Sequence, residues 1–283
     1  MTKRKQLLAA MAVAAPFMFA APAHAEFIIS GWTIDPSAAD AGLPGPFTGV
    51  DQITFNAIVE ADTDAVAVGS TYDVRVLGTA TSLIGGGGII GGTGLNDTWE
   101  LTFEGDFQTV ITGIAGDVIQ FSHLAGGVLD FYLDDLTDGG QANTADAGTY
   151  TDGIFFAQFI DDGTGEGSIN TSALDGQDDF SADLNPENTL SGVLINAEGE
   201  DLDREGTGMV VDSNFDLDPD DNNTIDTTYG ALDCGASLAS HCAEEDGSAR
   251  LTEAQVPEPA VLGLLGLGLL GLGAHSLRRR NRA

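Results

Sequence analysis

Basic residues are scarce in this 283-residue chain, which has 10 Lys and Arg against 44 Asp and Glu. The stretch 26–255 has no lysine, 43 acidic residues and a formal net charge of −40. Its basic residues are Arg75, Arg204 and Arg250. A protein that binds nucleic acid neutralises phosphates with Lys and Arg. This composition therefore excludes nucleic acid as a partner, and it is equally unfavourable for anionic lipid surfaces.

Cysteine is limited to Cys234 and Cys242. In an oxidising compartment two nearby cysteines predict one disulfide that closes a small loop. A metal site that also uses His241 is the alternative, but these three residues fall short of the usual four ligands. Recognisable catalytic motifs are also missing, since there is no G-x-S-x-G sequence and His123 and His241 lie in no nucleophile motif. We therefore expect no enzymatic activity.

Long segments with helical periodicity are absent between the two ends of the chain. Instead, apolar and polar residues alternate, as in Ile53, Phe55, Ala57 and Val59. Period two is typical of half-buried strands. The same alternation occurs at 71–78, 99–107 and 128–135, and further candidate strands are 27–34, 109–114, 117–122, 153–161, 190–196 and 208–212.

Ten or so short strands with Gly-rich turns favour an all-β fold, an antiparallel β-sandwich or jelly roll. We assign this ectodomain to residues 26–242, with an acidic, loop-rich part at 198–242. Residues 243–255 are expected to form a linker.

The beginning of the chain has the three parts of a secretory signal. Lys3, Arg4 and Lys5 precede an apolar stretch at 7–21, and Ala23 and Ala25 occupy the positions that a signal peptidase reads. Residues 1–25 are therefore predicted to be a cleaved signal peptide. An uncleaved anchor helix is the alternative, although the apolar stretch is short for one.

The end of the chain combines an apolar segment with a basic cluster. Residues 260–277 carry no formal charge, and as a helix they would extend roughly 27 Å, close to the thickness of a hydrocarbon core. We predict a transmembrane helix there, with Arg278, Arg279 and Arg280 on the cytoplasmic side.

A stiff tetrapeptide precedes that apolar segment: Val256, Pro257, Glu258 and Pro259. Each proline fixes its own φ and favours extended backbone before it. The tetrapeptide, the apolar segment and the arginines together resemble a PEP-CTERM sorting signal over 256–283. The resemblance implies that an exosortase processes the tail after export, and that the protein reaches the cell surface or extracellular matrix, anchored to the membrane at least transiently. An ordinary single-pass anchor after a Pro-rich linker is the alternative.

The ectodomain resembles the flocculation-associated PEP-CTERM proteins over roughly residues 30–215. The resemblance is carried by "GWTIDP", "FTGVDQITFN", "GLNDTWELTF", "GGVLDFYLDD" and "DGIFFAQFIDDGTGEGSIN". It implies a role in cell aggregation or in the exopolysaccharide matrix. It brings no catalytic residues.

The acidic segment 218–226 has oxygen-bearing residues at alternate positions, as in a calcium-binding loop. Two features depart from that pattern: Asn223 replaces the expected glycine, and Tyr229 stands where a bidentate Glu is expected. An acidic turn without metal is the alternative. Calcium is thus the candidate cofactor, and its candidate ligands are Asp216, Asp218, Asp220, Asn222, Thr224 and Asp226.

These features lead to one functional hypothesis and two rivals. The hypothesis is a non-enzymatic surface or matrix protein that divalent cations bridge to exopolysaccharide or to like copies. The first rival is a carbohydrate-binding module that stacks sugars on Trp32 or Trp99. The second is a secreted polysaccharide hydrolase with a carboxylate pair that the sequence does not single out.

Overall fold

A computed structural model describes residues 26–63, 65–137, 140–218, 228–229, 232–233 and 240–254. One compact unit runs from Ile28 to Glu253 and contains the barrel and the candidate site. A second unit combines residues 1–27 and 254–283, of which the structure describes Glu26, Phe27 and Ala254.

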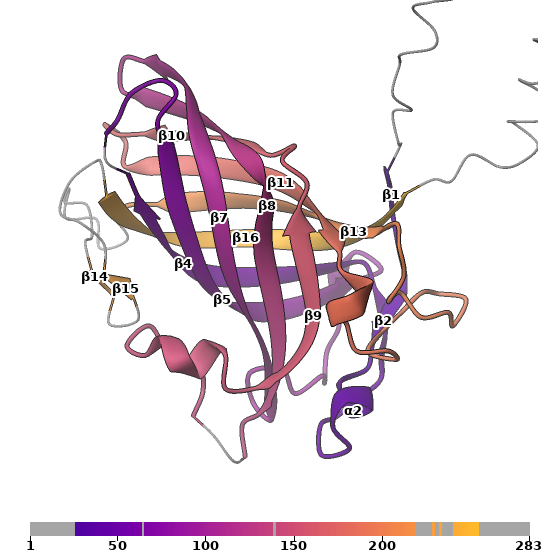
Figure 1. Cartoon of the computed structure of the whole chain (residues 1–283). Helices are drawn as coiled ribbons and strands as arrows, with labels where there is room; N and C mark the ends of the chain where they lie inside the picture. The colour runs from indigo at the N-terminus through magenta and orange to yellow at the C-terminus, as the bar shows by residue number, and fades with distance from the viewer. Residues whose placement is uncertain are drawn as a thin grey trace, which may run out of the picture. The chain divides into compact units, whose positions relative to one another are not determined.

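Strands dominate the described chain, and helices are limited to short turns (Figure 1). The strands are β1 (Glu26–Ile28), β2 (Trp32–Ile34), β3 (Phe47–Val50), β4 (Gln52–Asp62), β5 (Thr71–Gly85), β6 (Gly88–Ile89), β7 (Trp99–Ala115), β8 (Val118–Asp135), β9 (Ile154–Asp161), β10 (Glu166–Asn170), β11 (Asp175–Leu184), β12 (Leu194–Ile195), β13 (Thr207–Asp216), β14 (Thr228–Tyr229), β15 (Leu232–Asp233) and β16 (Ser240–Ala254). The helical turns are α2 (Pro36–Ala39), η2 (Ala147–Tyr150) and η3 (Pro186–Asn188).

Eight antiparallel strands form a closed barrel, in the order β4, β5, β7, β8, β10, β11, β13 and β16. The barrel closes because β16 also pairs with β4, from Ala249 opposite Ile53 to Ser240 opposite Asp62. The short β9 pairs with β8 and β11 further along those strands, beyond the end of β10. Every barrel strand therefore has a neighbour on both sides.

The predicted β-sandwich or jelly roll is wrong, although the predicted all-β class agrees with the structure. A sandwich would leave the first and last strands as edges of two sheets, whereas here β4 and β16 pair with each other. Several predicted short strands also merge into long ones. The segments at 99–107 and 109–114 lie in β7, and 128–135 and all but the first residue of 117–122 lie in β8. Bulges of β7 near Gln108 and Gly113 help to bend this strand pair.

The expected linker at 243–255 also differs from the structure. Residues 243–254 belong to β16, the strand that closes the barrel. Apolar residues alternate there, since Ala243, Ala249 and Leu251 are buried. The inward face of this strand also carries Glu245 and Gly247, which interrupt the apolar alternation in the sequence.

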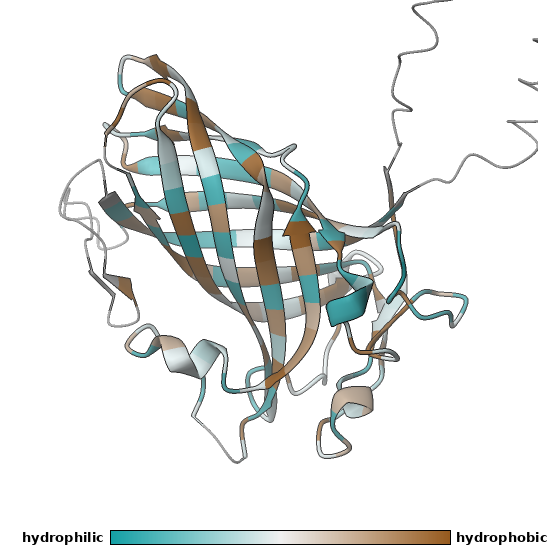
Figure 2. Ribbon diagram, viewed as in Figure 1, coloured by the Kyte–Doolittle hydropathy of each residue, from teal (hydrophilic) through white to brown (hydrophobic). Residues whose placement is uncertain are grey.

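The barrel interior is filled by alternate residues of each strand. Figure 2 shows hydrophobic and hydrophilic positions following one another along the strands. Phenylalanine dominates this core: Phe103 contacts Phe55 edge-to-face at 5.2 Å between ring centroids, and Phe131 at 5.6 Å. The sheet of β12, β2 and β3 adds the fully buried Trp32 and Ile34 to the same core.

A smaller apolar cluster covers part of the outer wall, formed by Ile58, Leu77, Tyr150, Leu232 and Cys242. Nearby, the fully buried Glu100 accepts a hydrogen bond from the Ala142 N–H at 2.9 Å, and burial raises the pKa of Glu100 to about 7.

Close packing inside the barrel requires glycine at position 78 of β5. A Cβ atom there would lie 2.0 Å from the ring of Phe103, and Phe103 is itself surrounded by aromatic rings. We expect Gly78→Ala to lower the free energy of unfolding by about 1–3 kcal/mol, the usual cost of overpacking a core. Urea denaturation measures this change. The matched control is Gly88→Ala, because a Cβ at Gly88 meets nothing within 4 Å; equal effects of the two changes would contradict the proposed clash.

Candidate functional site

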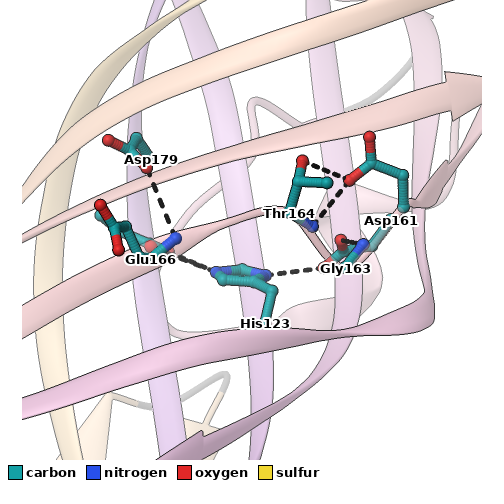
Figure 3. A network of polar contacts seen from close by, with 8 residues as sticks. His123, Asp161, Gly163, Thr164, Glu166 and Asp179 are labelled. Carbon is teal, nitrogen blue, oxygen red and sulfur yellow. Dashed lines mark hydrogen bonds and ion pairs between the residues drawn. The ribbon is translucent and has the colours of Figure 1, made fainter. Parts of the chain in front are cut away.

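A histidine held between two carboxylates lies inside the barrel wall (Figure 3). His123 of β8 places Nδ1 2.6 Å from Oδ2 of Asp161, and Nε2 2.9 Å from Oδ2 of Asp178. Asp161 is the last residue of β9, and Asp178 lies on β11. All three side chains are buried, with 5%, 1% and 9% of their respective residues exposed. We call these residues the His123 triad.

Local sequence explains how the triad is assembled. His123 continues the inward series of Ile119 and Phe121 along β8. Two glycines of the turn between β9 and β10 then make room: a Cβ at Gly165 would lie 2.7 Å from the His123 ring, and the Gly163 N–H donates to Oδ1 of Asp161 at 2.8 Å. The Gly-rich turn therefore both orients Asp161 and admits the imidazole.

Three phenylalanine rings surround the same imidazole. Phe180 stacks on His123 with 5.0 Å between ring centroids and 16° between planes, and Phe107 and Phe121 approach at 5.9 Å and 6.4 Å. Aromatic faces attract cations. The rings and the carboxylates thus favour the same protonated form of His123.

Electrostatics of the His123 triad follow from burial and pairing. Burial alone would lower the pKa of His123, but hydrogen bonds to Asp161 and Asp178 raise it to about 9. Burial raises the pKa of Asp178, and His123 opposes that change. At neutral pH His123 is therefore an imidazolium that compensates the buried carboxylates.

A fourth ionisable group, Glu245 of β16, faces the interior beside the triad. It is 6% exposed, and burial raises the pKa of its carboxyl to about 8, with Asp178 adding to the rise and His123 opposing it. Glu245 is thus mainly protonated at neutral pH. The interior of the barrel holds this neutral acid next to an ion-paired histidine.

These groups border a cavity inside the barrel, of about 70 Å³. Apolar side chains make up most of its lining, together with His123, Asp178, His241 and Glu245. His241 of β16 is buried, which lowers its pKa to about 4. A mainly apolar cavity with a few converging polar groups is the usual form of a small-molecule site.

The chemistry open to the His123 triad is limited by its own hydrogen bonds. Both ring nitrogens of His123 contact carboxylates, so neither is placed to take a proton from a nucleophile. The triad is therefore best understood as an internal ion cluster that fixes β8, β9 and β11 together.

Most of the site residues predicted from the sequence lie outside the described residues. These are Ala23, Ala25, Asp220, Asn222, Thr224, Asp226, Cys234, Val256, Pro257, Glu258, Pro259, Arg278, Arg279 and Arg280. The same holds for the predicted transmembrane helix 260–277. Cys242 is buried and takes part in a disulfide, and its pairing with Cys234 stays a prediction.

Of the six candidate calcium ligands, the structure describes Asp216 and Asp218. Oδ1 of Asp216 accepts a hydrogen bond from the Asp218 N–H at 2.9 Å, the arrangement of an acidic turn. Within the described ranges, no three His, Cys, Asp or Glu residues are grouped so that they could hold a metal ion. Calcium binding at this segment stays a prediction.

Trp32 and Trp99 are both fully buried, and Trp99 stacks on Phe47 with 5.5 Å between ring centroids. Neither indole offers a face for stacking a sugar.

Neither the His123 triad nor Glu245 is among the site residues predicted from the sequence. Extending the period-two pattern of the candidate strand 117–122 by one residue would place His123 on the inward face after Phe121, and this is the one available signal. The partners on β9, β11 and β16 come together only when the barrel closes.

Among the residues that the structure describes, no helix is long and apolar enough to cross a membrane.

No curated protein matches the chain. A family model described as the PEP-CTERM protein-sorting motif matches residues 255–280, which confirms the sorting signal predicted at 256–283. Such a motif marks a protein for export, for processing by an exosortase and for sorting to the cell surface. The chain therefore carries a PEP-CTERM protein-sorting motif, which follows the β-barrel in the sequence.

Proposed function

We propose that this exported barrel is a non-enzymatic cohesion protein, which divalent cations bridge to anionic exopolysaccharide or to further copies of itself. The observation that carries the proposal is the arrangement of carboxylates on the outer wall. Four neighbouring strands, β10, β11, β13 and β16, present a continuous acidic surface to solvent. We call it the carboxylate face, and its exposed acids are Glu166, Asp175, Asp179, Asp183, Asp212, Asp216, Glu244 and Asp246.

Several of these acids lie directly opposite one another across the sheet. Asp179 is in register with Glu166 on one side and with Asp212 on the other. Asp216 is likewise in register with Asp175 and with Glu244. Like charges in directly opposed positions destabilise a sheet, so two rows of three carboxylates each are held at an electrostatic cost.

Divalent cations would relieve that repulsion. In the proposed arrangement each row supplies some of the oxygen ligands of a cation, and a second surface supplies the others. Uronate or sulfate groups of a polysaccharide can supply them, and so can the carboxylate face of another copy. Sorting to the cell surface brings such partners within reach.

A settling experiment tests this function. Cells that lack the protein are given back either the natural chain or a variant in which Glu166, Asp179 and Asp212 are changed to Gln, Asn and Asn. We expect the natural chain to restore calcium-dependent settling, and the variant to need several-fold more calcium for half-maximal settling, because one row of cation ligands is lost.

The matched control changes three exposed acids outside the carboxylate face, Asp97, Asp117 and Glu198, to their amides. It removes the same charge, and we expect it to settle like the natural strain. Surface amounts of each chain are compared by immunolabelling. Settling that is unaffected by chelating calcium, or an equal loss in both variants, would count against the carboxylate face.

A further inference from the structure

The cavity inside the barrel is lined by residues from all eight barrel strands, and its volume is about 70 Å³. A water molecule needs roughly 10–15 Å³ on this scale, and an apolar cavity of about 150 Å³ accepts benzene. The cavity therefore has space for several small atoms but not for a ring. Any occupant is narrow and has only a few non-hydrogen atoms.

His241 gives this apolar cavity one unused polar atom. The residue is 5% exposed, lines the cavity, and its Nδ1 has no hydrogen-bond partner among the described residues. Tyr72 contacts the imidazole edge-to-face at 5.9 Å between ring centroids. Buried polar atoms without a partner are rare and need an explanation. Since His241 stays neutral at pH 7, it can either accept or donate one hydrogen bond.

The charges around the cavity restrict the ligand further. Asp161 and Asp178 already pair with the imidazolium of His123 at 2.6 Å and 2.9 Å. A second cation would therefore gain little by binding to them. An anion would meet these carboxylates in a medium of low dielectric constant, which is unfavourable. An uncharged ligand avoids both problems.

We propose that the barrel cavity is a binding site for a small uncharged molecule with a short apolar body and one hydroxyl or comparable group, which hydrogen-bonds to Nδ1 of His241. The apolar body lies among the phenylalanine and aliphatic side chains of the cavity. This site is independent of the carboxylate face, which points outward from the barrel.

The experiment uses the protein expressed as the full chain and purified in the form that cells export. Its methyl and imidazole NMR resonances are followed during titration with 1-propanol, with 1-hexanol, and under xenon pressure. We expect 1-propanol and xenon to shift resonances of cavity residues and 1-hexanol to leave them unchanged, because the longer chain exceeds the cavity.

Two variants test separately whether binding needs the hydrogen bond to His241 and whether it needs the free volume of the cavity. His241→Phe keeps a ring but removes Nδ1, and should weaken 1-propanol binding roughly fivefold to tenfold, about one net hydrogen bond, while xenon still binds. Ala243→Leu, which fills the cavity between His241 and Glu245, should abolish binding of both. Ser248→Ala, on the same strand but outside the cavity lining, is the control and should bind both as the natural protein does.

Three results would overturn the proposal. The natural protein could fail to bind either probe, which would mean that the cavity holds only water. His241→Phe could bind 1-propanol as well as the natural protein, which would remove the hydrogen bond. Finally, 1-hexanol could bind more tightly than 1-propanol, which would indicate a surface site. Because the xenon and His241→Phe measurements do not depend on Ala243→Leu, the test stands even if that variant does not fold.

Discussion

Replacing His123 by alanine will lower the free energy of unfolding by about 3–5 kcal/mol, the effect expected when one partner of a buried ion pair is removed. The change leaves Asp161 and Asp178, which are 1% and 9% exposed, without the imidazolium that now contacts both. It also removes the ring on which Phe180 stacks. We expect it to be the most destabilising single change in the barrel.

Urea denaturation followed by circular dichroism measures this loss. A companion variant changes Asp161 and Asp178 to Asn in the His123→Ala background, which removes the uncompensated charges. We expect it to recover part of the lost stability. A control, Gln120→Ala, replaces an exposed residue of the same strand and should change stability by less than about 0.5 kcal/mol. A loss for His123→Ala no larger than that control would show that the triad does not hold the barrel together.

Raising the pH from 6.5 to 9 will destabilise the barrel, and Glu245 and His123 both act in that direction. The pKa of Glu245 rises from 4.5 in the unfolded chain to about 8 in the fold. Between those values the folded state keeps a proton that the unfolded chain releases, so stability falls as pH rises. The pKa of His123 rises from 6.5 to about 9. Its stabilising contribution is complete below pH 6.5 and disappears as pH rises through 9.

The charged groups that act on Glu245 are Asp178, Asp246 and His123. Together the two titrations should lower the free energy of unfolding by several kcal/mol across this range, at about 1.4 kcal/mol for each unit of pKa difference. Thermal unfolding recorded at half-unit steps of pH will follow the decline.

Glu245→Gln isolates the glutamate's share of this effect. The amide does not ionise, so the variant should be more stable than the natural protein at pH 8 by about 2–4 kcal/mol, and the two should converge near pH 5. The control is Asp117→Asn, an exposed acid between β7 and β8 that is not among the groups acting on Glu245, and it should keep the natural pH dependence. If the free energy of unfolding of Glu245→Gln equals that of the natural protein at every pH, then the fold does not raise the pKa of Glu245.

The strands of this protein could be predicted from the sequence better than their arrangement. Alternation along residues such as Ile53, Phe55 and Ala57 shows that one face of a strand is buried. It does not show whether that face is covered by a second sheet or by the far wall of the same sheet. That choice depends on the pairing of β16 with β4. The inward positions of β16 include Glu245 and Gly247, so apolar alternation does not reveal this closing strand in the sequence.

The sorting signal could be predicted from the sequence, whereas the ionisable groups inside the barrel could not. A sorting signal is read as a linear sequence, and so Pro257, Glu258 and Pro259 identified it without any structure. The His123 triad depends on contacts between residues 38 and 55 positions apart. Among so many acidic residues, nothing in the sequence distinguishes Asp161, Asp178 and Glu245 from their solvated neighbours.

The pairing of β16 with β4 also sets the order of events during synthesis and export. A chain emerges from its N-terminus, so β4 appears early and has no partner on one side until β16 follows, since Asp62 pairs with Ser240 and Ile53 with Ala249. The sorting motif begins at residue 255, directly after β16 ends at Ala254. Barrel closure and presentation of the sorting tail therefore become available at almost the same moment, so a chain truncated before β16 would lose both together.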